Sequence, residues 1–158
     1  MNERSPTMLA LRPWSTQQTT GSVSRLIRRT LLEIGWSDVA GEVRAVMDLL
    51  ADQDRGIALL AEVDGRLIGA VAAERRTTRP ALFIRWLVVD PDFRRQGVAS
   101  ALMNTLEASS GVLRIDGMVD QQDAAAVGFW QSRGWTVLRP CLDRRRQLMG
   151  TQPREVAA

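Results

Sequence analysis

A short basic loop, Arg94-Arg95-Gln96-Gly97-Val98-Ala99, is the stretch of this sequence best suited to hold a ligand. The apolar run 82–89 before it has the composition of a buried strand and stops at Asp90-Pro91, where proline removes a ladder donor. After the loop, apolar residues recur at helical spacing: Ala99, Leu102, Met103 and Leu106. A loop that opens a helix presents unpaired N–H groups and a positive dipole end, and Gly97 allows close backbone approach. The pattern indicates a phosphate site, although an ordinary strand-to-helix connection also fits.

The composition of the chain limits the kinds of ligand that we expect. The 158 residues suit one domain, and a hydrophobic content of 45% is ordinary for a globular protein. With no histidine and a single cysteine, Cys141, we expect no metal site and no internal disulfide. All basic side chains are arginines, and a net charge of +3 is too small to favour nucleic acid as the ligand.

The sequence also bears on location and domain limits. No apolar run approaches the roughly 18 residues that a membrane-spanning helix needs. The first residues lack the uninterrupted apolar core of a signal peptide. We therefore expect a cytoplasmic protein without a membrane partner, with one domain at 1–150 and a C-terminal tail at 151–158.

The remaining pattern supplies the elements that must position the loop. Asp64-Gly65 is the clearest local signal, because this dipeptide suits the positive φ angles of a hairpin turn. Ser15 and Gln18 have capping-box spacing before a helix that carries Val23, Leu26, Ile27, Leu31 and Ile34 on one face. Strands are expected at 7–12, 57–63, 66–73, 82–89, 112–119 and 135–138, with 147–149 continuing the last one or pairing separately. Helices are expected from Ser15 to Ile34, at 38–51, after Gly97 and at 123–132.

Two segments resemble motifs of the GNAT superfamily of N-acetyltransferases. Arg94, Gly97 and Ala99 match the first, fourth and sixth positions of R/Q-x-x-G-x-G/A, the pyrophosphate loop of that family. The segment 123–135 resembles N-x-x-A-x-x-L-Y-x-x-x-G-F at unchanged spacing, and 87–91 looks like the family's fourth strand. The resemblance implies an α/β fold: a single-domain, GNAT-like mixed sheet of about six or seven strands flanked by about four helices.

The resemblance also implies acetyl-CoA as the acyl donor. Its pyrophosphate would lie against the backbone N–H groups of residues 95–100, and its pantetheine arm would pair with the fourth strand near Leu87 and Val89. Arg94 or Arg95 would reach phosphate, and the Ser100 hydroxyl would bond either phosphate or water. The implied cofactor-binding set is Leu87, Val88, Val89, Arg94, Arg95, Gln96, Gly97, Val98, Ala99, Ser100, Asp123, Ala126 and Trp130.

The reaction implied by the resemblance is direct attack of a primary amine on the thioester in a ternary complex. A backbone N–H of the splayed fourth strand stabilises the developing oxyanion, and Val89 is the candidate donor. The alternative for Val89 is a plain sheet amide. A splay between the strands 82–89 and 112–119 would distinguish the two.

The chain departs from the family pattern at two positions. Trp130 stands where many members carry a tyrosine acid, its indole N–H cannot give up a proton near neutral pH, and the chain has no tyrosine. Water or Cys141 would then protonate the thiolate, unless Cys141 is simply a buried hydrophobe. Asp123 replaces the usual asparagine, and a role as helix N-cap is sufficient for it.

A general base is not evident, because the fourth strand carries Arg85 and Trp86 where some relatives have a carboxylate. Asp116 and Glu74 are the remaining candidates, acting through water. Each is otherwise a structural or surface charge. An acceptor amine of low pKa would need no base.

Four side chains are candidates for contact with the acceptor. Trp36 and Trp86, with Arg85 and Arg75, either line an acceptor pocket or belong to the core. An arginine there disfavours a polycation, which favours a small amine, an amino-acid-like molecule or a protein N-terminus. A homodimer is a family-level expectation. The competing functions are a non-catalytic acyl-CoA-binding or sensing domain of the same fold and a nucleic-acid-binding protein.

Overall fold

The computed structural model of the chain describes residues 8–15, 20–78, 80–112, 114–140 and 146–151. These residues form one seven-stranded sheet with the order β1-β2-β3-β4-β5-β7-β6. The strands are β1 (Leu9–Pro13), β2 (Gly56–Val63), β3 (Arg66–Arg75), β4 (Ala81–Val89), β5 (Arg114–Asp120), β6 (Thr136–Pro140) and β7 (Arg146–Gly150). Neighbouring strands are antiparallel except β4 and β5, which are parallel. The sheet is therefore mixed, as predicted.

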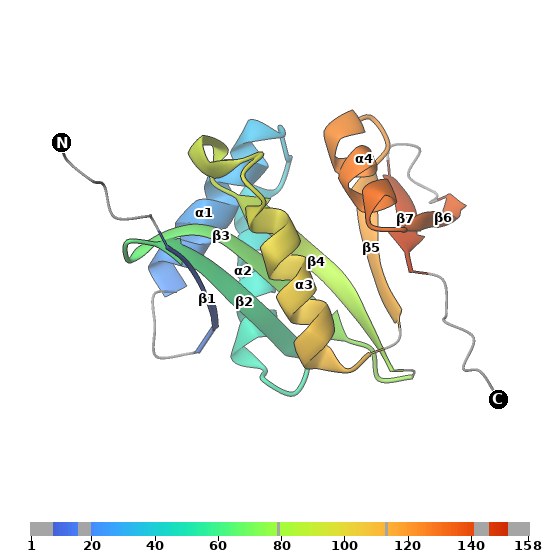
Figure 1. Cartoon of the computed structure of the whole chain (residues 1–158), viewed down its shortest axis with the longest axis horizontal. Coiled ribbons are helices and arrows are strands. Elements are labelled where there is room, and N and C mark those ends of the chain that lie inside the picture. The colour runs from blue at the N-terminus through green and yellow to red at the C-terminus, as the bar shows by residue number, and fades with distance from the viewer. Residues whose placement is uncertain (1–7, 16–19, 79, 113, 141–145, 152–158) are drawn as a thin grey trace.

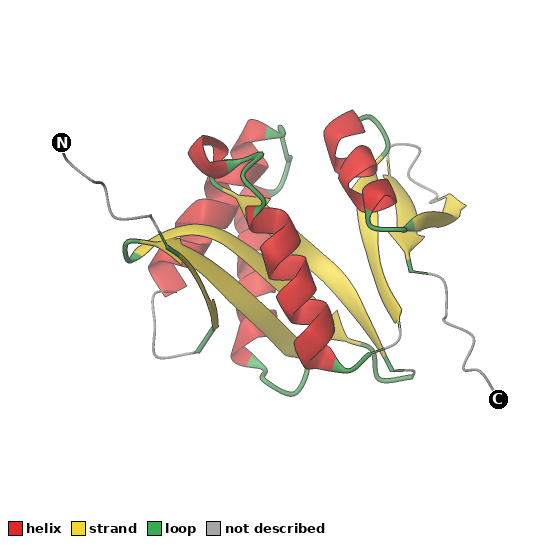
Figure 2. Ribbon diagram, in the orientation of Figure 1, coloured by secondary structure: helices red, strands yellow, loops and turns green. Residues whose placement is uncertain are grey.

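Helices cover both faces of this sheet (Figure 1, Figure 2). They are α1 (Thr20–Glu33), α2 (Val39–Ala51), α3 (Val98–Ser110) and α4 (Ala124–Ser132), with a short 3-10 helix η1 (Pro91–Phe93) before α3. One buried cluster joins α1 and α2 to the strands, and a second joins α3 and α4 to the opposite face. The predicted α/β class, with four α-helices in the described residues, is confirmed.

The local signals explain most of the element boundaries. Asp64 and Gly65 have φ angles of 50° and 75° and join β2 to β3, as the hairpin signal predicted. The Asp38 side chain accepts a hydrogen bond from the Gly41 N–H and so caps α2. Ile34 is exposed, contrary to the prediction for the helix face, because α1 ends one residue earlier at Glu33.

At the end of the chain, the structure decides between the two alternatives for residues 147–149. Residues 146–150 form a separate strand, β7, inserted between β5 and β6, so 147–149 pairs separately rather than continuing the preceding strand. Pro140 is the last residue of β6. Ser15 is described but Gln18 is not, so the predicted capping box lies partly outside the described residues. Cys141 and residues 152–158 of the expected tail also lie outside them.

Candidate active site

β4 and β5 run side by side for only four residue pairs, from Ala81 opposite Arg114 to Ile84 opposite Gly117. The pairing stops where β4 carries one residue more than β3: Ala72 lies opposite Trp86 and Ala73 opposite Ile84, which leaves Arg85 as a bulge. A bulge bends its strand and increases the local twist. Beyond it the two strands diverge (Figure 1). We call β4 residues 85–89 and β5 residues 118–120 the splay.

The Val89 backbone faces the splay. The Asp90 N–H donates to the Ile68 carbonyl at 2.7 Å and so points toward β3. Successive N–H groups of a strand point to opposite sides, so the Val89 N–H points away from β3, toward the side that β5 has left. The Val89 carbonyl, on that same side, accepts a hydrogen bond from Arg94 Nε at 3.0 Å. A backbone donor is thus directed into the opening between the strands.

The basic loop lies beside the splay and ends in an uncapped helix. Arg95 and Gly97 have φ angles of 62° and 82°, and Gly97 precedes α3 without any side-chain cap. The first helical hydrogen bond of α3 runs from the Ala101 N–H to the Gly97 carbonyl, at 2.9 Å. The N–H groups of residues 98–100 therefore precede the helix's own hydrogen bonding and sit at its positive end, as an anion requires.

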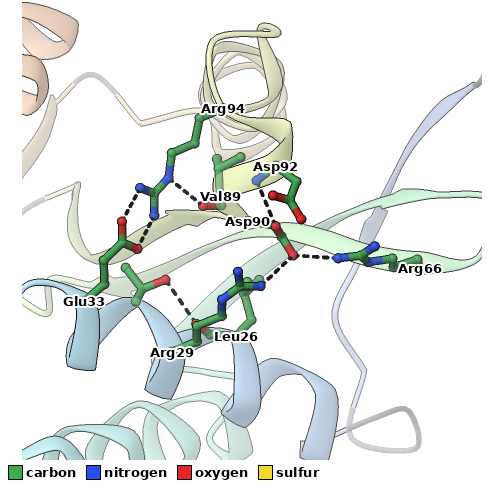
Figure 3. A network of polar contacts seen from close by, with 9 residues as sticks. Leu26, Arg29, Glu33, Arg66, Val89, Asp90, Asp92 and Arg94 are labelled. Atoms are coloured by element: carbon green, nitrogen blue, oxygen red, sulfur yellow. Dashed lines mark hydrogen bonds and ion pairs between the residues drawn. The ribbon is translucent and has the colours of Figure 1, made fainter.

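The Arg94 guanidinium links three elements of the structure. Its guanidinium donates to both carboxylate oxygens of Glu33 at 2.7 Å, while its Nε holds Val89 (Figure 3). The hydrogen bond from Arg94 lowers the pKa of Glu33 below its ordinary value. Arg94 thus connects the end of α1 to the end of β4. Arg94 and Arg95 are both exposed, and the phosphate contact expected of one or the other stays a prediction.

The second sequence motif forms a capped helix packed on the core. The Asp123 carboxylate accepts a hydrogen bond from the Ala126 N–H at 3.0 Å, which is the N-cap role that residue type predicts. Trp130 is buried and stacks on Trp135, with ring centroids 4.1 Å apart. Asp123, Ala126 and Trp130 therefore have a structural role, and their predicted role in cofactor binding stays a prediction.

The two carboxylates predicted as bases do not lie at the splay. Asp116 is opposite Phe83 in the paired half of β4 and β5, only 2% exposed, and accepts a hydrogen bond from Arg114 Nε at 2.8 Å. Glu74 is also opposite Phe83, on the β3 side, and pairs with Arg55 at 2.8 Å. Gly69, not Glu74, is opposite Val89. The structure therefore separates both carboxylates from the candidate oxyanion donor by most of the length of β4.

A different carboxylate, Glu42 of α2, lies against the splayed half of β4. Its Oε1 accepts a hydrogen bond from Trp86 Nε1 at 2.8 Å and lies 3.7 Å from the Arg85 guanidinium. Trp36, in the α1–α2 connection, meets Trp86 edge to face with centroids 5.5 Å apart. The Arg146 guanidinium of β7 lies 5.6 Å from the Trp36 ring centroid. Segments far apart in sequence thus form one half-buried wall of aromatic and charged side chains.

The sequence named Trp36, Trp86, Arg85 and Arg75 as residues of either an acceptor pocket or the core, and it did not name Glu42. The structure brings the first three together in this wall, whereas Arg75 lies at the other end of the β3–β4 pairing, opposite Leu82. Position 42 reads as one more polar residue near the start of an amphipathic helix. Its distinguishing property is the contact with Trp86, which exists only after α2 packs on the sheet. The sequence alone therefore gives no signal that Glu42 belongs to this wall.

Comparison with known proteins agrees with this geometry. Residues 24–135 match the Acetyltransferase (GNAT) family. The chain belongs to the GNAT family. An acetyltransferase of Pectobacterium atrosepticum is 29% identical over 99 residues, a match that covers 61% of this chain and 66%, just under two thirds, of that relative. The expected family resemblance is confirmed.

Solved structures of GNAT proteins share the fold. The PaiA N-acetyltransferase of Thermoplasma acidophilum, in complex with coenzyme A, has a TM-score of 0.75 at 16% identity, covering 92% of this chain and 99% of that one. The aminoglycoside 6'-N-acetyltransferase of Enterococcus faecium has a TM-score of 0.70 at 20% identity, covering 92% and 98%. Identity this low supports the fold and leaves the acceptor open.

No helix within the described part of the chain is both long and apolar enough to cross a membrane. The same residues contain no group of three or more metal-ligating side chains that would hold a metal ion.

Proposed function

We propose that this GNAT protein transfers the acetyl group of acetyl-CoA to a primary amine by direct attack within a ternary complex. The observation that carries the proposal is the juxtaposition of the splay, with its inward Val89 N–H, and the uncapped start of α3. One feature offers a donor for a thioester oxygen, and the other offers donors for a diphosphate.

The residues present suit the cofactor. The backbone N–H groups of residues 95–100 would hold its pyrophosphate, and the free edge of β4 at Leu87–Val89 would pair with its amide-bearing arm. Positive φ at Arg95 and Gly97 turns the loop, and the space around Gly97 is open, with no atom within 4 Å of a Cβ built there. The coenzyme A complex of the PaiA neighbour supports the same ligand.

Acetyl-CoA supplies an activated thioester when bound, and the protein would supply position and charge stabilisation. Attack by a neutral amine forms the new C–N bond, breaks the C–S bond, releases the thiolate and leaves one proton to be removed from nitrogen. The Val89 N–H is placed to stabilise the negative charge on the carbonyl oxygen. Removal of such a donor typically lowers turnover by about 10² to 10³, so this one N–H would supply a large part of the rate enhancement.

Glu42 is the carboxylate we propose for the proton, directly or through one water molecule. Trp86 and Arg85 hold it at the splayed half of β4. It replaces Asp116 and Glu74, because those two are bound to arginines in other parts of the sheet.

The leaving thiolate has no tyrosine to protonate it. The chain contains none, and the Trp130 indole is stacked within the core. A thiol pKa near 8.5, the value for cysteine, makes the thiolate a tolerable leaving group. We therefore propose that it departs unassisted and takes its proton from water.

The wall around Glu42 also narrows the acceptor class. The Glu42 carboxylate beside Trp86 suits a single ammonium group. Arg85 and Arg146 beside them repel a polycation. We propose a monoamine: a small amine, an amino-acid-like molecule or a protein N-terminus.

The test is release of coenzyme A thiol from acetyl-CoA across a panel of amines, with mass spectrometry of each product. Acetylation of at least one monoamine, abolished by Gly97→Glu, is the expected result. Failure of the protein to bind coenzyme A in calorimetry contradicts the proposal.

A second candidate function, a non-catalytic acyl-CoA sensor, is favoured by one observation. The position of the family's acid is a core tryptophan, so the chain can keep the fold and the phosphate loop without the acid. Tight binding of acetyl-CoA with no thiol release on any amine would select this function.

A further inference from the structure

We infer that a hollow between α1 and the β2–β3 turn is a second anion site, built for the phosphate group of a ligand and separate from the basic loop. The hollow measures about 390 Å³. Three arginines line it together with a serine hydroxyl and one carboxylate: Arg25, Arg29, Arg66, Ser22 and Asp90.

The charge of this hollow is unbalanced. Arg25, Arg29 and Arg66 contribute three positive charges and Asp90 one negative charge, which leaves two positive charges in excess. A compact dianion would balance them. Phosphate monoesters carry about −1.5 to −2 at neutral pH, so the phosphate group is the ligand class that matches.

Asp90 fixes the two central guanidiniums. It is 4% exposed, and its Oδ2 accepts from Arg66 at 3.0 Å and from Arg29 at 3.4 Å (Figure 3). The Arg66 guanidinium also lies 5.5 Å from the Phe93 ring centroid. Anchored arginines lose less conformational entropy when they bind than free ones do.

Most donors of these arginines stay available. A guanidinium has five N–H donors, and a single N–H of each is engaged with Asp90. Arg29 and Arg66 are 54% and 58% exposed, so they still face solvent in the hollow. Arg25 donates to the Ser22 hydroxyl at 3.1 Å on the same wall. Forked guanidinium donors are suited to bidentate phosphate contacts.

The hollow is distinct from the proposed cofactor site. Asp90 turns its N–H to β3, whereas the Val89 N–H turns to the splay. The lining comes from α1 and the start of β3 and includes none of residues 94–100. Ligands of the two sites would therefore bind independently.

The experiment is calorimetric titration of inorganic phosphate into the full chain at constant ionic strength. Wild type, Gly97→Glu, the double variant Arg29→Gln/Arg66→Gln and the control Arg28→Gln are compared. Arg28 is an exposed arginine of the same helix outside the hollow, so its substitution removes the same kind of charge. Thermal unfolding checks that each variant is folded.

We expect saturable binding in Gly97→Glu, where the loop is blocked and the hollow remains, and a component of the same affinity in wild type and Arg28→Gln. The double variant should weaken that component by at least about tenfold. Binding that disappears in Gly97→Glu would assign the phosphate to the basic loop and overturn the inference. Absence of saturable binding, or equal weakening by Arg28→Gln, would overturn it as well.

Discussion

At the scale of single residues, the side chains around the splay act through partners that only the fold provides. Arg94 or Arg95 was predicted to reach phosphate, and in the structure Glu33 and the Val89 carbonyl engage three of the five N–H groups of Arg94. Holding that carbonyl fixes the peptide plane at the end of β4. Arg94 therefore serves as a positioning residue for the strand end that carries the proposed oxyanion donor.

Substitution of Glu42 tests the proposed proton acceptor. Glu42→Gln keeps an oxygen for the Trp86 N–H but removes the carboxylate's basicity, so the fold and coenzyme A affinity should stay unchanged. A general base contributes about 10² to 10⁴, and we expect kcat to fall about 10²-fold. Initial rates of thiol release measure the effect.

The matched control for Glu42 is Asp48→Asn, an exposed carboxylate of the same helix. It should keep the wild-type rate. Equal rates for wild type and Glu42→Gln would leave proton removal to water.

Asp90 should make the stability of the fold sensitive to acid. Burial raises its pKa, but the Asp92 N–H, Arg66 and Arg29 outweigh burial, and the pKa lies below its ordinary value. A lowered carboxyl pKa stabilises the fold above the unfolded value of about 3.9 and loses that contribution as the pH falls further. Asp90→Asn should lower the free energy of unfolding by on the order of 2 kcal/mol at pH 7. The difference from wild type should become smaller below about pH 4.

Urea unfolding of wild type and Asp90→Asn at pH 7, 5 and 3 measures this difference. Asp92→Asn is the control, because Asp92 is exposed and its N–H, rather than its carboxylate, bonds Asp90. If the unfolding free energies of wild type and Asp90→Asn differ by the same amount at all three pH values, the charge of Asp90 is not the source of the stabilisation.

At the scale of elements, the β4 bulge creates the splay. Ile84 is the last β4 residue paired with β5, and Arg85 is the extra residue that follows. An extra residue bends the strand away from its neighbour and exposes the N–H groups beyond. The sequence of β4 is apolar apart from Arg85 and Trp86 at this point, and it does not by itself predict the bulge, because the bulge is defined by the register with β3.

The parts of the site that sequence could predict are those with local causes. The strand at 82–89, the loop with Gly97 and the helix after it follow from composition, turn chemistry and periodicity, and the structure contains each of them. The capping role of Asp123 is equally local. The carboxylate we propose, Glu42, has no such local cause, and the sequence offered Asp116 and Glu74 instead, because the position of a carboxylate relative to Val89 depends on tertiary packing.

The glycines at the two ends of α3 provide a test of the cofactor site and its matched control. Gly97 and Gly111 flank the helix with φ angles of 82° and 63°, and neither has an atom within 4 Å of a built Cβ. A side chain at either position costs about 1–2 kcal/mol of backbone strain. Gly97→Glu also places a carboxylate where the proposed diphosphate lies, so coenzyme A binding should fall below detection.

Gly111→Glu introduces the same residue and comparable strain at the far end of α3. We expect it to retain coenzyme A affinity within about twofold, since it alters no proposed donor. Calorimetry with both variants decides the matter. Loss of affinity in both, or in neither, would remove the loop from the cofactor site.

At the scale of the whole molecule, the composition makes the chain electrostatically constant near neutral pH. It has no histidine, and the printed sequence contains no lysine or tyrosine, so arginines and carboxylates carry almost all its charge. Both kinds of group ordinarily titrate well away from neutral pH. The single Cys141 and the α-amino group are the exceptions, and a rate that changes with pH between 6 and 10 needs another source.

That source should be the acceptor itself. A neutral amine attacks, so kcat/KM should rise with pH up to the pKa of the amine used and then level off. With two amines whose pKa values differ by about two units, the inflection should move by the same two units. Profiles of kcat/KM for wild type and Cys141→Ser should coincide for each amine. One inflection shared by both amines would instead reveal a titrating group of the protein and contradict the proposal that the fold supplies position and charge while the acceptor supplies its own reactivity.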